Sequence, residues 1–202
     1  MVEFRQHKLY YSPSSPFVRK VLIIAKEVGL YDHIELIPVQ VSPLSVNNSQ
    51  FALENPLAKI PTLLVPDIGP LFGSSVICQY LLSVAESQES QNSQHLLADG
   101  AGDALLLMRF ESIRPAEKKW DEFYAGQFGK VNRAFDELEK IQQNETNSDA
   151  WDLGHVAALC ALSYADLRFK GPFDWRDGRP ALQSWFENAV LTRDSVKNTF
   201  LQ

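Results

Sequence analysis

The 202-residue sequence is poor in cysteine and has no long apolar run. Its two cysteines, Cys78 and Cys160, lie far apart inside apolar stretches, and no C-x-x-C or His/Cys cluster occurs. These absences argue against a disulfide framework, a metal site and a dithiol redox motif. The densest apolar stretch, residues 156–162, is far too short to span a bilayer.

An excess of positive charge is also missing. Lys and Arg number 19 against 25 Asp and Glu, which gives a net charge of −6. Nucleic-acid surfaces need clustered Lys and Arg, so this balance argues against a nucleic-acid partner, and no basic amphipathic stretch suggests membrane adhesion. The first residues, MVEFRQHK, lack the apolar core of a secretory signal. We therefore expect a cytoplasmic protein that binds neither nucleic acid nor membrane.

A polar stretch divides the chain. Residues 83–102 are rich in Ser, Gln and Glu, as linkers are. We place the linker at residues 83–98, between a first domain of residues 1–82 and a second domain of residues 99–202.

The two predicted domains differ in their hydrophobic patterns. The first alternates strand and helix signals in the order βαβ, a short helix, then ββα, which favours a small mixed sheet covered by helices. The second reads as helical throughout, with helices expected from about Asp103, around residues 128–141, and over residues 153–167 and 180–191. The last residues, 192–202, read as a tail packed on the surface. The expected fold class is α/β plus all-α.

The first motif is Ser-Pro-Phe at residues 15–17, where a strand gives way to a helix. Ser15 fits the N-cap and Pro16 the first helical turn, so one interpretation is a simple cap. The other interpretation uses the positive end of the helix, where a thiolate that also accepts a hydrogen bond from a hydroxyl becomes more acidic. Ser12 and Ser14 fit turn positions better.

Two further motifs follow in the first domain. In ENPLAKIPTLL, residues 54–64, Pro61 leads straight into a strand, and a cis Ile60–Pro61 bond would turn the backbone of Ile60 outward to pair with an extended peptide. A loop proline without a ligand is the alternative. In LFGSSVICQYL, residues 71–81, Ser74 can cap a helix, and an anion at that helix start would meet its N–H and hydroxyl.

Taken together, the Ser-Pro-Phe helix start, the N-P-x-x-K-I-P segment and the Ser-x-x-Ile-x-x-Tyr helix resemble the N-terminal thioredoxin-like domain of cytosolic glutathione transferases. An all-helical second domain after a polar linker is similar to that family too. The segments ALSYADLRF and DWRDGRPALQSWFENAVLTRDS resemble the closing helices of its bacterial and fungal members. The Ser-Pro-Phe form also resembles the plant tau class.

The resemblance implies a glutathione site in the first domain. Ser15 would stabilise the thiolate of glutathione, and Phe17 would be a wall of the site. The backbone of Ile60, before Pro61, would pair with the cysteinyl unit. Lys59 would reach the glycyl carboxylate, and Ser74 would bind the γ-glutamyl carboxylate.

The resemblance also implies a second substrate, a hydrophobic electrophile, in a cleft against the first helices of the second domain. Arg109, Phe110 and Ile113 are candidate residues of that cleft. Glutathione would be a co-substrate, no metal would be needed, and the family's habit predicts a homodimer.

The sequence departs from the family pattern at two places. Gly73 stands where the family usually has Glu or Asp to hold the γ-glutamyl ammonium. The capping box of the second domain reads Asp152-Leu153-Gly154-His155, in which Asp152 can still cap. The leading hypothesis is a glutathione transferase for detoxification, whose glutathione thiolate conjugates an electrophilic carbon or reduces a peroxide of a hydrophobic substrate. The alternative is a binding or regulatory module with the same fold and no turnover.

Overall fold

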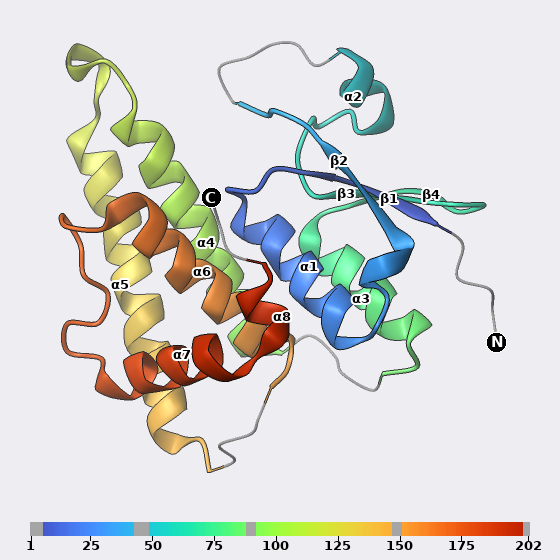
Figure 1. The fold of residues 1–202 in the computed structure, drawn as a ribbon. Coiled ribbons are helices and arrows are strands. Elements are labelled where there is room, and N and C mark those ends of the chain that lie inside the picture. The colour runs from blue at the N-terminus through green and yellow to red at the C-terminus, as the bar shows by residue number, and fades with distance from the viewer. Residues whose placement is uncertain (1–5, 43–48, 88–91, 147–150, 200–202) are drawn as a thin grey trace. The chain divides into compact units, whose positions relative to one another are not determined.

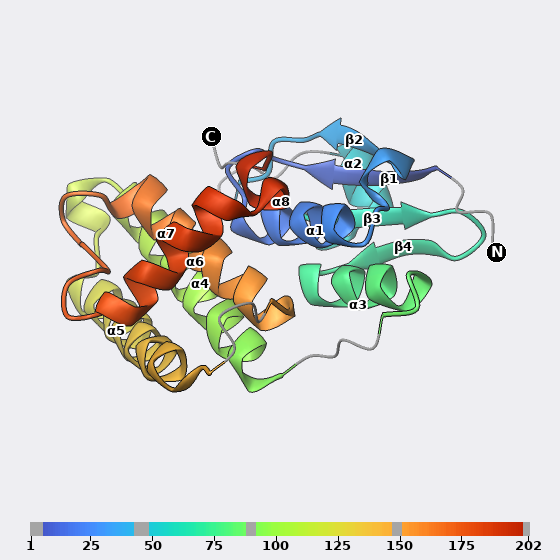
Figure 2. The same ribbon diagram turned by 60° about the horizontal axis from the view of Figure 1, so that its bottom comes forward.

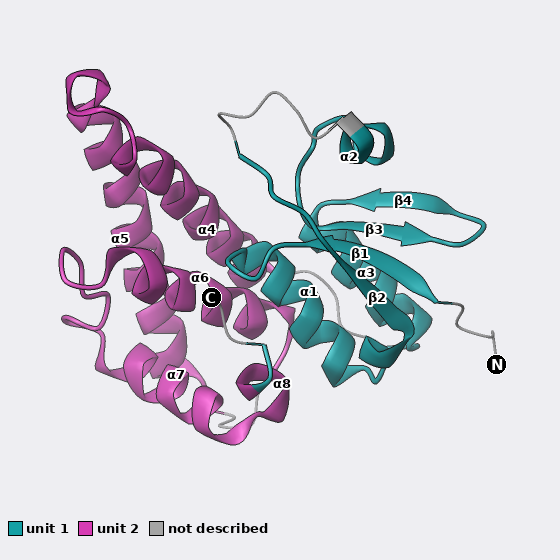
Figure 3. Ribbon diagram, turned by 45° about the horizontal axis from the view of Figure 1, so that its top comes forward, with its two compact units in different colours: residues 1–90, 198–202 teal, residues 91–197 magenta. Residues whose placement is uncertain are grey.

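A computed structural model describes residues 6–42, 49–87, 92–146 and 151–199 of the chain (Figure 1). The chain forms two compact units, residues 1–90 with 198–202 and residues 91–197 (Figure 3). Helices α3, Ser74–Val84, and α4, Ser93–Ser112, extend into both ends of the linker predicted at residues 83–98. The start of α4 is polar in composition although it carries the buried His95.

The first unit contains a four-stranded mixed sheet in the order β2-β1-β3-β4. Strand β1 runs parallel to β2 and antiparallel to β3, and β3 pairs with β4 as a hairpin. This arrangement confirms the mixed sheet expected from the βαβ-ββα pattern. Its elements besides α3 are β1 (His7–Tyr11), α1 (Pro16–Glu27), β2 (Ile34–Pro38), α2 (Ser49–Glu54), β3 (Thr62–Val65) and β4 (Gly69–Phe72).

The alternation of side chains along β1 determines which helix covers which face of the sheet. His7 lies 2.8 Å from the hydroxyl of Tyr80 on α3, so its face of the sheet carries α3 and the neighbouring α1 (Figure 2). Tyr10 points to the opposite face, where its ring lies 4.8 Å from the ring of Phe51 on α2. The sheet is therefore covered on both faces, as the buried Leu9 and Leu63 require.

The second unit is helical, as predicted. Besides α4 it contains α5 (Asp121–Asn144), α6 (Leu153–Phe169), α7 (Pro180–Thr192) and α8 (Asp194–Lys197). Almost all of α6 is buried, which confirms a helix surrounded by others. One expectation was wrong, because α4 begins well before Asp103. The segment after α7 was expected to be a tail packed on the surface; it contains α8, whose Ser195 and Val196 are buried.

The starts of α4 and α6 are capped together. Asn92 caps α4 by accepting from the N–H of His95 and also donates to Asp152, 2.8 Å away. Asp152 caps α6 because its side chain accepts from the backbone N–H of His155. Nδ1 of the His155 ring accepts from the backbone N–H of Asp152, which completes a capping box. The hydrogen bond from His155 lowers the pKa of Asp152 to about 2. Asp152 therefore caps, as the sequence predicted.

Candidate functional site

The strand register brings the three sequence motifs to one end of the sheet. Tyr10, near the end of β1, pairs with Thr62 at the start of β3, and Thr62 pairs with Phe72 at the end of β4. The loop after β1 leads to Ser15, and Ser74 follows β4 at the start of α3. The starts of α1 and α3 thus flank the residue before β3, which is Pro61.

Ser15 caps α1 with its side chain. Its Oγ accepts from the N–H of Val18 at 3.3 Å, and its backbone is extended with φ −88° and ψ 120°. Pro16 occupies the first turn, where its missing N–H costs nothing, and no acidic side chain lies in that turn. Because the oxygen acts as the acceptor in the cap, the proton of the half-buried Ser15 hydroxyl can still donate to another group.

The two other serines of this turn have a different role. The hydroxyls of Ser12 and Ser14 share a hydrogen bond of 3.3 Å, and the carbonyl of Ser12 accepts from the N–H of Ser15. This agrees with the prediction that Ser12 and Ser14 are turn residues. Among the three serines, only Ser15 combines a helix cap with a position at the first turn of α1.

The loop before β3 is held by a buried asparagine. The side-chain amide of Asn55 donates to the carbonyl of Lys59 and to Oγ1 of Thr62, each at 2.9 Å, and its oxygen accepts from the N–H of Leu57. Thr62 also donates to the Lys59 carbonyl at 2.9 Å. Asn55 is 1% exposed and Thr62 is 0% exposed. These bonds fix the backbone on either side of the Ile60–Pro61 peptide, which is cis.

Asn55 is a residue that sequence reasoning missed. The Asn-Pro pair predicted only a turn, and nothing in the sequence indicated that the asparagine side chain would turn inward toward Thr62. In the structure the buried Asn55 satisfies both its donor group and its acceptor, as a buried amide must. Lys59 itself is exposed, and Ile60 is half-buried.

The start of α3 differs from the prediction. Gly73, not Ser74, is the N-cap residue, and its φ of +82° is one that glycine adopts without strain. Ser74 is the first helical residue and is buried, so its N–H belongs to the free donors at the helix start. Gly73 leaves this turn without a side-chain cap, and the first turn of α3 has no acidic residue.

A buried lysine joins the two helix starts. Lys20 on α1 is 1% exposed, and its ammonium lies 3.4 Å from Oγ of Ser75 on α3 and 6.0 Å from the centre of the half-buried Phe17 ring. Sequence reasoning did not single out this lysine, since it lies among the buried positions of an amphipathic helix. Its positive charge and the two helix N-termini together favour an anionic ligand at this end of the sheet.

Tyr80, part of the third motif, lies outside this group. Its hydroxyl shares the 2.8 Å hydrogen bond with His7, the first residue of β1, at the other end of that strand. Burial raises the pKa of Tyr80. Tyr80 therefore links α3 to the sheet and does not line the end where Ser15 and Ser74 lie.

The candidates for the second-substrate site lie in the second unit, at the C-terminal end of α4. Arg109 and Phe110 are half-buried, and Ile113, the C-cap residue, is 44% exposed. The buried side of this end of the helix is formed by Leu105 and Met108.

Comparison with known proteins bears on both units. The family model for the glutathione S-transferase N-terminal domain matches residues 9–89, and the model for the C-terminal domain matches residues 121–188. The GST-like protein YibF of Escherichia coli K12, itself uncharacterized, is 32% identical over 95% of this chain and 97% of its own length. The chain belongs to the glutathione S-transferase family. The fold class and family suggested by the sequence are therefore confirmed.

Solved structures of the family are similar over the whole chain. A glutathione transferase family member from Pseudomonas fluorescens Pf-5, with bound glutathione, is 30% identical with a TM-score of 0.85, covering 97% of this chain and 99% of its own. A glutathione S-transferase from Methylobacillus flagellatus KT, also with glutathione bound, is 29% identical with a TM-score of 0.82, covering 97% and 100%. Glutathione is thus a ligand of proteins that share this chain's full fold.

Among the residues that the structure describes, no helix is both long and apolar enough to cross a membrane. Within the same residues, no three His, Cys, Asp or Glu side chains gather where they could hold a metal ion.

Proposed function

We propose that the protein is a glutathione transferase whose activating residue is Ser15. The Ser15 hydroxyl donates to the sulfur of glutathione, while the N-terminus of α1 stabilises the negative charge of the thiolate. The observation that carries this proposal is the Ser15 side chain, which caps α1 as an acceptor and keeps its proton for a ligand. The glutathione-bound relatives of similar fold support the choice of ligand.

The other contacts with glutathione follow from the same end of the sheet. The backbone of Ile60, beside Pro61, pairs with the cysteinyl unit, and Lys59 binds the glycyl carboxylate. Ser74, with its N–H at the start of α3, binds the γ-glutamyl carboxylate. Phe17 forms a wall of the site.

The proposed reaction is nucleophilic. The glutathione thiol loses its proton to solvent, the thiolate attacks an electrophilic carbon of a hydrophobic substrate, and a sulfur–carbon bond forms as the leaving group departs with its electron pair. Lowering a thiol pKa by two or three units, about 1.4 kcal/mol each, ionises most of it at neutral pH. Arg109, Phe110 and Ile113 contact the second substrate in this proposal. The homodimer, the cytoplasmic location, the role in detoxification and the tau-like subclass stay predictions.

Gly73 favours a second candidate function, a binding module without turnover. The turn before α3 has no carboxylate to hold the γ-glutamyl ammonium. Losing one charge-assisted hydrogen bond weakens binding by about 1.5–3 kcal/mol. A protein of this fold can then serve as a regulatory or binding partner rather than as a catalyst.

Retention on immobilised glutathione, followed by turnover of 1-chloro-2,4-dinitrobenzene, separates the two functions. In that assay the thiolate replaces chloride, so a transferase shows both retention and turnover, and a module shows retention alone. Ser15→Ala should lower turnover roughly 10- to 100-fold, the effect of losing a hydrogen bond to a charged group, about 1.5–3 kcal/mol. Ser15→Thr should restore most of it, because Thr keeps both the cap and the hydroxyl.

Ser14→Ala is the matched control, since the Ser14 hydroxyl is engaged with Ser12. It removes a hydroxyl one position away and should leave turnover unchanged. Ser15→Ala also loses the helix cap, about 1 kcal/mol, so thermal unfolding must show that the variant is folded in the assay. Wild-type turnover in a folded Ser15→Ala variant would remove Ser15 from the mechanism.

A further inference from the structure

The ammonium of a buried lysine lies beside the starts of two helices in the first unit. Lys20 on α1 is 1% exposed, and its Nζ lies 3.4 Å from the hydroxyl of Ser75, the second residue of α3. The centre of the Phe17 ring, in the first turn of α1, is 6.0 Å from the same Nζ. Long side chains of a helix lean toward its N-terminus, which is why Lys20 reaches back to that turn. Its positive charge is therefore close to the first turns of both helices.

The surroundings of this ammonium favour an anion over a cation. In the first turns of α1 and α3, which the structure describes in full, no side chain is acidic. The free N–H groups at each helix start carry a partial positive charge, which adds to the charge of Lys20. Gly73, the N-cap residue of α3, is exposed and brings no side chain. A negatively charged group of a ligand is therefore attracted here, and a positively charged group is repelled.

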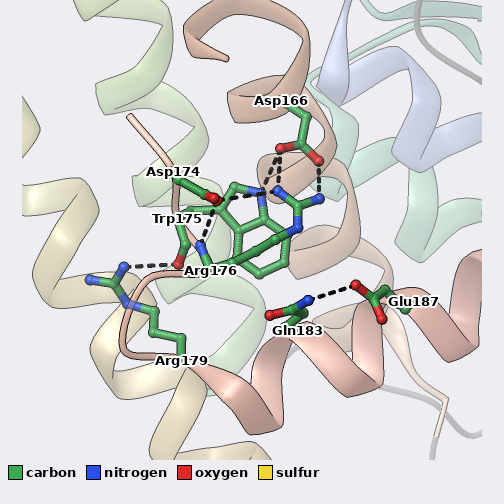
Figure 4. A network of polar contacts seen from close by, with 7 residues as sticks. All are labelled: Asp166, Asp174, Trp175, Arg176, Arg179, Gln183 and Glu187. Carbon is green, nitrogen blue, oxygen red and sulfur yellow. Dashed lines mark hydrogen bonds and ion pairs between the residues drawn. The ribbon is translucent and has the colours of Figure 1, made fainter. Parts of the chain in front are cut away.

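The two arginines that precede α7 are bound by carboxylates and indicate no ligand site. Arg179 is 6% exposed and donates to the carboxylate of Asp136 at 2.6 and 2.9 Å and to the carbonyl of Trp175 at 2.9 Å. Arg176 donates to both carboxylate oxygens of Asp166 at 2.7 Å (Figure 4). These pairs attach the segment before α7 to α5 and α6, which is a structural role.

We propose that Lys20 makes the start of α3 select the carboxylate of the γ-glutamyl unit and not its ammonium. This inference rests on the proposed function, in which Ser74 binds that carboxylate. The Lys20 ammonium, held by the neighbouring Ser75, adds a buried charge to the contact, and burial reduces the screening by water and salt. The γ-glutamyl ammonium finds no carboxylate at Gly73. The ligand class is therefore a glutathione-type thiol peptide with this carboxylate, whether or not its amino group is present.

A purely structural role for Lys20 predicts a different result. A lysine that only joins α1 to α3 would stabilise the fold, and its loss would affect the binding of all ligands alike. A lysine that acts on the carboxylate changes the binding of only those ligands that carry this group. Ligands that differ by one charged group therefore distinguish the two roles.

The test measures the dissociation constants of three S-methylated peptides by calorimetry. S-methylglutathione carries both charged groups, its glutaryl analogue lacks only the ammonium, and its 4-aminobutanoyl analogue lacks only the carboxylate. Because a methylated sulfur cannot ionise, the measurement depends neither on Ser15 nor on turnover.

Lys20→Met is the main test variant, because it removes the ammonium and keeps a long, flexible side chain. Ser75→Ala is the second, because it removes only the hydroxyl that holds the ammonium and so remains informative if Lys20→Met does not fold. Lys26→Met is the matched control. Lys26 is half-buried in the last turn of the same helix, and its ammonium lies 3.6 Å from the centre of the Tyr31 ring.

We expect the wild type to bind the 4-aminobutanoyl analogue at least tenfold more weakly than S-methylglutathione, the effect of one charge-assisted hydrogen bond. The glutaryl analogue should bind within about threefold of S-methylglutathione, because its missing ammonium has no partner here. Lys20→Met should weaken the binding of both carboxylate-bearing peptides about tenfold, and Ser75→Ala about threefold. Neither variant should change the binding of the 4-aminobutanoyl analogue, and Lys26→Met should bind all three peptides as the wild type does.

The outcomes distinguish this inference from the proposed function. Selective binding of the carboxylate-bearing peptides, lost in Lys20→Met, would support the inference even if no turnover of 1-chloro-2,4-dinitrobenzene were found. A wild type that needs the ammonium more than the carboxylate would overturn the inference and leave the glutathione site in place. Equal weakening of all three peptides in the folded test variants, or no weakening in any, would do the same. Binding of none of the three peptides by the wild type would overturn both.

Discussion

Asn55→Ala tests what holds the backbone around Ile60–Pro61 in place. The substitution removes the two hydrogen bonds that the Asn55 amide donates and the one that its oxygen accepts. A typical protein hydrogen bond contributes about 1 kcal/mol net, so the full loss is about 3 kcal/mol. Two partners are partly compensated. Thr62 still donates to the Lys59 carbonyl, and the N–H of the exposed Leu57 can turn to water.

We therefore expect Asn55→Ala to lower the free energy of unfolding by about 2 kcal/mol, measured by urea denaturation. Asn144→Ala is the control, because Asn144 also donates from its side chain to a backbone carbonyl, that of Lys140 at 2.7 Å, but is exposed. Surface substitutions of this kind change stability by at most about 0.5 kcal/mol. A loss in Asn55→Ala no larger than in the control would refute the bracing role.

A double-mutant cycle with Thr62→Val isolates the contact between the two side chains. Valine keeps the shape of threonine and removes the hydroxyl that accepts from Asn55. Since the two groups are in direct contact, we expect a coupling free energy of about 1 kcal/mol. Additive losses would mean that Asn55 acts through its backbone contacts alone.

Three further predictions concern the joined caps of the second unit and the proposed catalyst. The pKa of Asp152 is lowered to about 2 from 3.8, so its stabilisation is present above pH 4 and is lost as the pH falls toward 2. Asp152→Ala should cost about 1 kcal/mol at pH 7 in urea denaturation and clearly less at pH 2, where the carboxyl of the folded protein is about half protonated, and a constant difference would contradict this. Gly154→Ala should destabilise by about 1–3 kcal/mol, because an added Cβ would lie 2.8 Å from Asn92 Oδ1. Gly100→Ala should instead stabilise the protein by about 0.5–1 kcal/mol, because no atom lies within 4 Å of the added Cβ. Thermal melts in which both glycine variants are less stable than wild type, or both more stable, would contradict this packing. Ser15→Ala should keep retention on immobilised glutathione while its turnover falls, which affinity chromatography and the chloride-displacement assay measure separately.

The sequence predicted the parts of the fold that depend on local chemistry. Ser15 and Pro16 begin α1 as expected, because a cap and a first-turn proline act within one turn of helix. The mixed sheet followed from the order of strand and helix patterns. The start of α4 was missed, because the exposed polar side of a helix has the composition of a linker.

The missed site residues depend on contacts across the sequence. The contact of Lys20 with Ser75 forms only once α1 and α3 lie side by side, and no pattern near Lys20 indicates it. Asn55 turns inward because Thr62 and the Lys59 carbonyl are buried beside it. Gly73 is the N-cap residue and has a positive φ, and the sequence could suggest that φ but could not establish it.

The charges at the starts of α1 and α3 bear on the choice between enzyme and module. Neither first turn has an acidic residue, and the buried Lys20 adds a positive charge between the two helices. This end of the sheet therefore favours the anionic groups of glutathione, its carboxylates and its thiolate, more than its ammonium. Stabilising a thiolate is the step that catalysis needs, whereas holding the ammonium contributes to affinity alone. The absence of a carboxylate at Gly73 should consequently raise the KM for glutathione while kcat is kept. A Gly73→Asp variant tests this when compared with Gly73→Ala, because both carry the strain of a Cβ at a φ of +82° and only the first carries a carboxylate. A lower KM for Gly73→Asp than for Gly73→Ala at equal kcat would fit the argument, and a different kcat at equal KM would contradict it.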